Sequence, residues 1–363
     1  MTERRQSTVV TLGGGSTAVT IGGTAPIRIQ SMLCTDSHDV DACYQQIQAL
    51  TDAGCEIVRL AIPDIEAAKT IAALKERGVT VPLVADIHFD FRIALEAAAC
   101  GVDKIRINPG NIGDDDRVHA VVKACATRGI PIRIGVNSGS LEKYILAKYG
   151  APTAAALAES ALYHASLLEK FDFGDIVLSV KASTVKSMIE ANRCLAAQCS
   201  YPLHLGVTEA GSVRMGTVKS DIGIGALLAD GIGDTIRVSL TADPVEEILA
   251  AKRILSALDL CGGYDVVSCP TCGRTQIPLV DMVSAFEARM NELPTLSNGK
   301  TMRVAIMGCV VNGPGEAREA DLGLAGGINE AVLIRRGEIL KKVPADNAVS
   351  ALIDLIKEEV KRL

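Results

Sequence analysis

The chain has 363 residues, of which 48% are hydrophobic and 22% are charged, and its formal net charge is −6. This length predicts two domains, or one large barrel with an appendage. The acidic balance and the 3% of aromatic residues argue against a nucleic-acid-binding protein. We find no apolar run long enough to span a membrane and no apolar signal core in the first residues, so we expect a cytoplasmic protein.

Short apolar strands alternate with helical patterns from residue 26 to about residue 260. Several of the predicted helices end in glycine just before the next strand, as helices commonly do. Eight such units predict a (β/α)₈ TIM barrel over residues 1–260, with an open doubly wound α/β sheet as the alternative. The predicted strands are residues 26–32, 56–62, 82–88, 104–110, 131–138, 175–183, 202–211 and 235–241.

The segment between the fifth and sixth predicted strands, residues 139–174, is long and predicts additional helix, which would serve as a lid or as a packing surface. After residue 260 the alternation stops, and residues 261–363 predict a small α+β domain. We expect a helix over 280–293, a strand over 302–308, a hairpin over 330–344 and a closing helix over 350–363.

The predicted barrel strands carry polar side chains at every second position, which places them on one face of each strand. Strands that are buried on both faces should be apolar, so inward polar residues near the strands' C-terminal ends indicate a site at the barrel mouth. A cluster of cations in an acidic protein repels itself unless a ligand with several negative charges binds, and arginine forks suit phosphate oxygens. Six strands contribute a cation: Arg28, Arg59, Arg106, Arg133, Lys181 and Arg237.

The two remaining strands contribute acid–base groups, namely Asp86 and His88 on the third strand and Glu209 on the seventh. The pattern therefore predicts a phosphorylated substrate that is held by the cations, with a carboxylate of the protein beside the reacting end of the substrate. The alternative is that the charged side chains pair with one another inside the barrel. Arg28 and Arg237 in particular could form structural pairs near its base.

Cys269 and Cys272 form a CxxC motif, and Cys309 follows in a later loop. Taken alone, CxxC fits half of a zinc site, a redox-active dithiol, or two ligands of an iron–sulfur cluster. A structural zinc site needs four Cys or His ligands, and no histidine follows His204, although Cys261 could complete the set. A [4Fe–4S] cluster accepts three thiolates together with one weaker ligand.

Glu316 lies seven residues after Cys309, across the glycine-rich loop 312–315. Such a loop lets the backbone turn tightly, so the carboxylate could return toward a cluster as a displaceable oxygen ligand. The spacing fits an ordinary exposed carboxylate equally well, and both interpretations stay open at this point.

The two cysteine motifs, SCPTCGR over 268–274 and GCVVNGPGEA over 308–317, closely resemble the cluster-binding motifs of the 4-hydroxy-3-methylbut-2-enyl diphosphate synthase family. The resemblance runs from roughly residue 7 to the C-terminus and is to the shorter bacterial form. The barrel motifs that share it are VRLAIP, ADIHFD, IRINPGNIG, IGVNSGS, SVKAS, LGVTEAG and IRVSLT.

This resemblance implies an iron–sulfur oxidoreductase of non-mevalonate isoprenoid biosynthesis. Such an enzyme would open the ring of 2-C-methyl-D-erythritol 2,4-cyclodiphosphate, remove a hydroxyl as water and add two electrons through a [4Fe–4S] cluster. Glu209 would be the general acid. The cluster ligands would be Cys269, Cys272, Cys309 and Glu316, and the substrate would displace Glu316 from the cluster. The diphosphate would be held by Arg59, Arg106, Arg133, Lys181 and Ser239. The pocket would be lined by Asp86, His88, Asn108 and Asn137.

The resemblance also implies partners. We expect a homodimer in which one subunit's barrel faces the other subunit's cluster domain, and a flavodoxin or ferredoxin as the electron donor. Two other interpretations share parts of the pattern. One is a dihydropteroate-synthase-like, phosphate-binding barrel with a structural zinc domain, and the other is a non-enzymatic zinc module for protein or RNA contact.

Overall fold

The structure is a computed structural model that describes residues 3–182, 184–294, 296, 300–309 and 319–362. The chain divides into two compact units, Met1–Leu258 and Asp259–Leu363. Within the described residues, no helix combines the length and the apolar character that crossing a bilayer requires.

The first unit is a barrel of parallel strands in the order β8-β7-β6-β5-β4-β3-β10-β9, which confirms the predicted TIM barrel. An isolated parallel bridge between Leu178 and Leu203 joins the two ends of this order. The strands are β3 (Arg28–Met32), β4 (Ile57–Ala61), β5 (Leu83–Asp86), β6 (Lys104–Ile107), β7 (Ile132–Asn137), β8 (Ile176–Lys181), β9 (His204–Leu205) and β10 (Thr235–Ile236).

The predicted bounds of the seventh and eighth strands were too long, because β9 and β10 have only two residues each. After β9 the chain leaves the sheet, and Glu209 has a φ of 52°, which lies outside the β region. After β10, the backbone N–H of Leu240 donates to the side chain of Glu247 at 3.0 Å instead of to a neighbouring strand.

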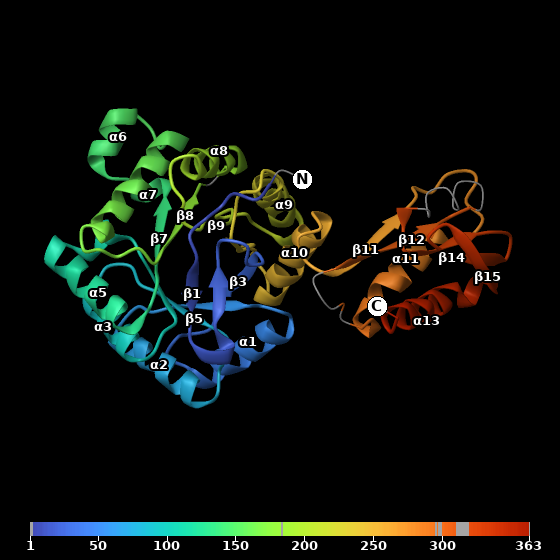
Figure 1. Cartoon of the computed structure of the whole chain (residues 1–363), viewed down its shortest axis with the longest axis horizontal. Coiled ribbons are helices and arrows are strands. Elements are labelled where there is room, and N and C mark those ends of the chain that lie inside the picture. Colours follow the sequence, from blue (N-terminus) through green and yellow to red (C-terminus); the bar gives the residue numbers. More distant parts are fainter. Residues whose placement is uncertain (1–2, 183, 295, 297–299, 310–318, 363) are drawn as a thin grey trace. The chain divides into compact units, whose positions relative to one another are not determined.

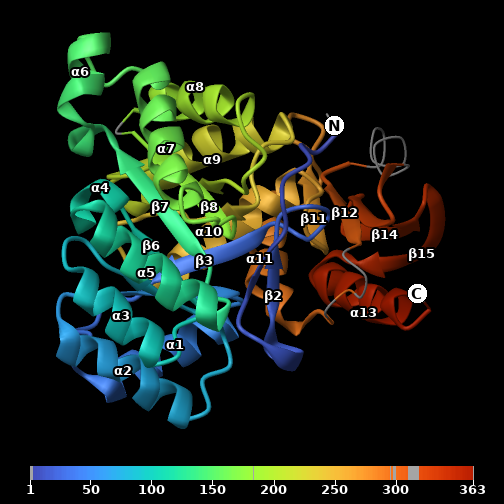
Figure 2. The same cartoon turned by 60° about the vertical axis from the view of Figure 1, so that its left-hand side comes forward.

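Helices surround the barrel strands in both views of the molecule (Figures 1 and 2). Aspartate side chains accept a backbone N–H at the start of five of them, which satisfies donors that the helix itself leaves free. The principal helices are α1 (Val40–Asp52), α2 (Ile65–Glu76), α3 (Phe91–Ala99), α5 (Asp115–Arg128), α8 (Val185–Ala196), α9 (Val213–Ala229) and α10 (Pro244–Ala257).

The insertion after β7 forms two helices, α6 (Lys143–Tyr149) and α7 (Ala154–Glu169). The helix α7 packs against β7, β8, α5 and α8, so the insertion is a packing surface of the barrel. It also contacts the short helix α4 (Pro109–Ile112), which follows β6.

An N-terminal hairpin, β1 (Val10–Leu12) paired with β2 (Val19–Ile21), was not predicted from the sequence. Its apolar side chains, including Leu12, pack against Ile57, Val84 and Val177, which lie near the beginning of their strands. The hairpin therefore closes the end of the barrel opposite the mouth.

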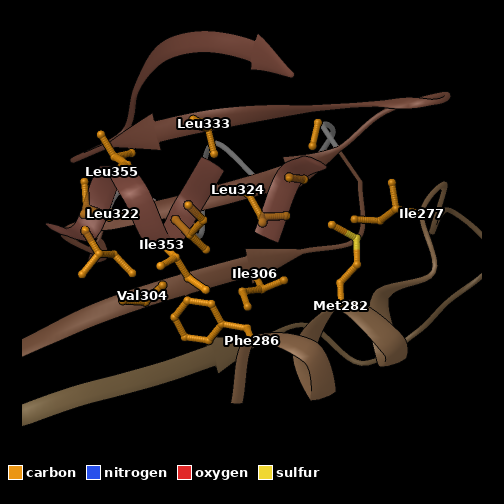
Figure 3. Close-up of a cluster of buried hydrophobic side chains, with 14 of the residues drawn as sticks. Ile277, Met282, Phe286, Val304, Ile306, Leu322, Leu324, Leu333, Ile353 and Leu355 are labelled. Carbon is orange, nitrogen blue, oxygen red and sulfur yellow. The ribbon is translucent and has the colours of Figure 1, made fainter. Parts of the chain in front are cut away.

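The second unit has a five-stranded sheet in the order β11-β12-β13-β14-β15. The strand predicted over 302–308 and the hairpin predicted over 330–344 are present, whereas β11 and β13 were missed. Figure 3 shows the core, in which Phe286, Val304, Ile306, Leu324 and Ile353 gather between sheet and helices. The elements are β11 (Gly263–Ser268), α11 (Leu279–Ala288), β12 (Thr301–Met307), β13 (Leu322–Gly326), β14 (Glu330–Arg335), β15 (Glu338–Pro344) and α13 (Ala348–Val360).

Candidate functional site

A polar cavity of about 220 Å³ lies inside the barrel, toward the C-terminal ends of the strands. Among the described residues, its lining contains five cationic side chains and no carboxylate. The lining residues are Arg59, Arg106, Arg133, Gly135, Asn137, Ser179, Lys181, Thr208, Arg237 and Ser239. A larger surface hollow, of about 410 Å³, has tyrosines and Glu159 at its edge. Glu159 is the charged residue among the described residues that line this hollow, and it is already bonded to Lys148 and Tyr149.

Asp86 is the carboxylate that organises one side of the cavity. It is 2% exposed, pairs with Arg59, and accepts a hydrogen bond from Nη1 of Arg106 at 3.0 Å. Burial alone would raise the pKa of Asp86, but the positive charges of Arg59 and Arg106 outweigh it and hold that pKa at about 2. Asp86 is therefore ionised at neutral pH and fixes two guanidinium groups in place.

Two other cations of the lining have no carboxylate partner among the described residues. Arg133 is 1% exposed, and its Nε and Nη1 atoms make no hydrogen bond in that part of the chain. Lys181 is half-buried, and burial together with the charges of Arg237 and Arg59 lowers its pKa well below the ordinary value. Unpaired cations of this kind require a partner, and a ligand with several negative charges would supply it.

Arg28 and Arg237 are the residues for which internal pairing is the better description. Arg28 bonds to Glu56 at 2.6 Å and does not line the cavity. Arg237 lines the cavity but lies 3.4 Å from Glu247, a buried residue of α10 that also accepts a hydrogen bond from Ser31. Glu247 was not predicted as a site residue, because it falls in the first turn of a helix, where glutamate is common.

The acid–base residues His88 and Glu209 both lie exposed. The Nε2 atom of His88 is 3.2 Å from Nη1 of Arg106, so His88 adjoins the cation cluster. Glu209 directly follows Thr208 of the cavity lining and has the left-handed φ of 52°. Such a conformation is strained for a non-glycine residue and is found more often at functional sites than elsewhere.

Of the remaining predicted pocket residues, Asn137 and Ser239 line the cavity. Asn108 is buried, follows β6, and caps α4 by accepting the backbone N–H of Gly110 at 3.1 Å. Gly135 and Thr208 line the cavity but were not predicted. Gly135 occupies the inward position between Arg133 and Asn137, so the alternation of side chains along β7 could have identified it.

Gly135 is needed for the position of Arg106. A Cβ atom on Gly135 would lie 2.6 Å from Nε of Arg106, which is closer than side-chain atoms approach one another. The absence of a side chain therefore lets the Arg106 guanidinium group lie directly over β7.

The second unit places two of the predicted cluster ligands, Cys269 and Cys309, at one edge of its sheet. The strands β11 and β12 are parallel neighbours, and Cys269 and Cys309 follow their C-terminal ends. The backbone N–H of Gly308 donates to Sγ of Cys269 at 3.3 Å. The backbone and side chain of Arg274 lower the pKa of Cys272 through hydrogen bonds, which favours the thiolate that metals bind.

Glu316 lies outside the described residues. Within them, no group of three His, Cys, Asp or Glu side chains is close enough to hold a single metal ion. A [4Fe–4S] cluster distributes its ligands over separate iron atoms, so three thiols on neighbouring loops, with a backbone N–H directed at one sulfur, fit such a group.

Among solved structures, the phospho-2-dehydro-3-deoxyheptonate aldolase of Thermotoga maritima matches with a TM-score of 0.50 and 14% identity. The match covers 70% of this chain and 74% of that chain, and it supports the barrel fold alone.

The sequence itself matches two family models, described as the GcpE TIM-barrel domain over residues 14–252 and the GcpE protein C-terminal domain over residues 265–358. A relative from Ruminiclostridium cellulolyticum, named 4-hydroxy-3-methylbut-2-en-1-yl diphosphate synthase (flavodoxin), is 57% identical over 93% of this chain and 94% of its own length. A relative of the same name from Fusobacterium nucleatum is 56% identical over 94% of this chain and 95% of its own. With both family models matched in order along the chain, the protein belongs to the GcpE family.

Proposed function

We propose that this protein is an oxidoreductase that converts 2-C-methyl-D-erythritol 2,4-cyclodiphosphate to 4-hydroxy-3-methylbut-2-enyl diphosphate. The reaction cleaves the ring C–O bond at one phosphate and releases a hydroxyl as water, with two electrons and a proton taken up. The observation that carries the proposal is the cavity whose lining, among the residues that the structure describes, has five cations and no carboxylate, because a cyclic diphosphate supplies the missing negative charges. The names of the relatives support it independently.

The cations of the cavity would bind and orient the diphosphate. Arg59 and Arg106 are held by Asp86, so they present fixed donors. Among the described residues, Nε and Nη1 of the buried Arg133 have no hydrogen-bond partner, and an anion would favour the protonated form of Lys181, whose pKa is lowered. Asn137 and Ser239 add hydrogen bonds from the same lining, and His88 and Asn108 would complete it.

Glu209 would deliver the proton to the departing oxygen. Its exposed position at the rim, next to Thr208 of the lining, suits a group that must reach the reacting end of the substrate rather than the diphosphate. The strained backbone at Glu209 supports this assignment.

A [4Fe–4S] cluster would be held by Cys269, Cys272 and Cys309 with Glu316 as the fourth, exchangeable ligand. When bound, it supplies electrons and a Lewis-acidic iron to the substrate. The word flavodoxin in the names of the relatives supports a flavodoxin as the electron donor, with a ferredoxin as the alternative. We further propose a cytoplasmic homodimer in which each barrel works with the cluster domain of its partner.

The alternative of a dihydropteroate-synthase-like condensing barrel with structural zinc is not favoured, because relatives matched over more than nine-tenths of the chain have a different name. The direct test is anaerobic turnover of the cyclodiphosphate with a reduced flavodoxin, followed by detection of the linear product. Glu209→Gln should retain the cluster's visible absorption and form no product. An active Glu209→Gln variant would remove Glu209 from the mechanism.

A further inference from the structure

The insertion after β7 contains a buried contact between a histidine and a glutamate that the proposed chemistry does not use. Glu142, the residue before α6, contacts Nε2 of His164 through Oε1. The side chain of His164 is 0% exposed, in the middle of α7, a helix that is otherwise mostly apolar on its buried side. A buried imidazole is costly unless a partner satisfies it, so the pair indicates a specific role at this place in the barrel.

His164 packs directly against the loop that follows β6. A Cβ atom on Gly110 would lie 2.7 Å from Cε1 of His164, so only glycine permits the imidazole to approach the α4 backbone this closely. The same Gly110 donates its backbone N–H to Oδ1 of Asn108 at 3.1 Å. The contacts therefore run in sequence from Glu142 through His164 and Gly110 to Asn108.

We propose that Glu142 and His164 are positioning residues that hold Asn108 in place at the barrel mouth. Asn108 directly follows β6, two residues after Arg106 of the cavity lining, and its backbone is still extended with a φ of −112° and a ψ of 109°. Because its Oδ1 atom is engaged by Gly110, its amide NH₂ group is the part left to donate to an anionic ligand. The inference rests on the proposed function, since it assumes that Asn108 takes part in binding the cyclodiphosphate.

The test uses the close contact between His164 and Gly110 as a double-mutant cycle in the cluster-loaded protein. Gly110→Ala should push the imidazole away, and His164→Ala should release the loop, so each should weaken cyclodiphosphate binding by at least about tenfold. In the double variant, the smaller side chain at position 164 leaves room for the new methyl group. Its affinity should therefore be no lower than that of either single variant.

Binding is measured by anaerobic calorimetry, turnover by KM and kcat, and folding by thermal unfolding of each variant. A positioning role should raise KM more than it lowers kcat. Ser160→Ala is the matched control, because Ser160 is equally buried on α7 and has no hydrogen-bond partner among the described residues. It should bind the cyclodiphosphate like the wild type even if it is less stable.

Glu142 provides a second route that disturbs the core less, because it lies at the start of α6 and is 17% exposed. Glu142→Ala should raise KM. Glu142→Gln, which keeps an acceptor oxygen, should have a KM close to that of the wild type. Wild-type KM in Gly110→Ala and Glu142→Ala, or affinity losses that multiply in the double variant, would overturn the inference. Turnover by the wild type decides the proposed function separately from these variants.

Discussion

Replacing Arg133 by methionine should have opposite effects on the stability of the free protein and on ligand binding. Arg133 is 1% exposed, and its Nε and Nη1 atoms have no hydrogen-bond partner among the described residues. Burial and the neighbouring charges of Arg59 and Arg106 both lower its pKa, so the charged side chain is held in an unfavourable environment. Methionine removes the charge and retains an unbranched side chain that fills much of the space.

The magnitudes follow from the cost of buried charge. Exchange of buried ionic groups for apolar ones of similar volume is often neutral or stabilises proteins by about 1–4 kcal/mol, and each kcal/mol raises the melting temperature of a protein of this size by about 1–2 °C. Loss of a charge-assisted hydrogen bond to the diphosphate should cost about 1.5–3 kcal/mol of binding. That corresponds to a loss of affinity of roughly 10- to 150-fold.

The assay is thermal unfolding with and without the cyclodiphosphate, together with calorimetric binding. Lys104→Met is the control, because Lys104 is equally buried, its Nζ atom has no hydrogen-bond partner in the part of the chain that the structure describes, and it is not among the residues that line the cavity there. It should stabilise the free protein in the same way and change ligand affinity much less. A lower melting temperature for Arg133→Met with unchanged affinity would contradict an anion-binding role for Arg133. It would favour the interpretation in which the charged side chains of the barrel pair with one another.

Three further variants test other parts of the site. The pKa of Asp86 is lowered to about 2, so its carboxylate contributes about 2 kcal/mol to the free energy of unfolding above pH 4, and this contribution is lost as the pH falls toward 2. Asp86→Asn should be less stable than the wild type at pH 7, and its free energy of unfolding should not show this decline in a pH series. The lowered pKa of Lys181 should rise when an anion binds, so binding should take up a proton and should weaken as the pH rises. Calorimetry in buffers of different ionisation enthalpy should detect this proton uptake, and Lys181→Arg should abolish the uptake. Gly135→Ala should displace Arg106 and raise KM at least tenfold, whereas Gly139→Ala, with no atom within 4 Å of the new Cβ, should have wild-type KM.

The inward-facing side chains of the barrel could be predicted from the sequence because alternation along a strand is fixed by backbone geometry. Arg106 on β6 and Arg133 on β7 both line the cavity for this reason. Glu247 could not be predicted, because the direction in which a helix residue points depends on how the helix packs on the sheet. Its contact with Arg237 joins residues from two elements whose relative position the sequence does not state.

The missed strands have a different cause. The strand β13 has the sequence LGLAG, and glycine has low strand propensity. A Cβ atom on Gly323 would lie 2.8 Å from the backbone oxygen of Ala305 in β12, so the close approach of the two strands favours glycine there. Tertiary contact thus overrides local propensity, which a single sequence does not reveal.

The central claim is a redox cluster held by the cysteines of the second unit, and metal content tests it most directly. We would isolate the protein without oxygen and measure iron, acid-labile sulfide and zinc per chain. We expect about four irons and four sulfides per chain, as a [4Fe–4S] cluster requires, with little zinc, and we expect Cys269→Ser to lose both iron and sulfide. One zinc per chain without sulfide, repeated after an attempt at cluster reconstitution, would contradict the redox mechanism.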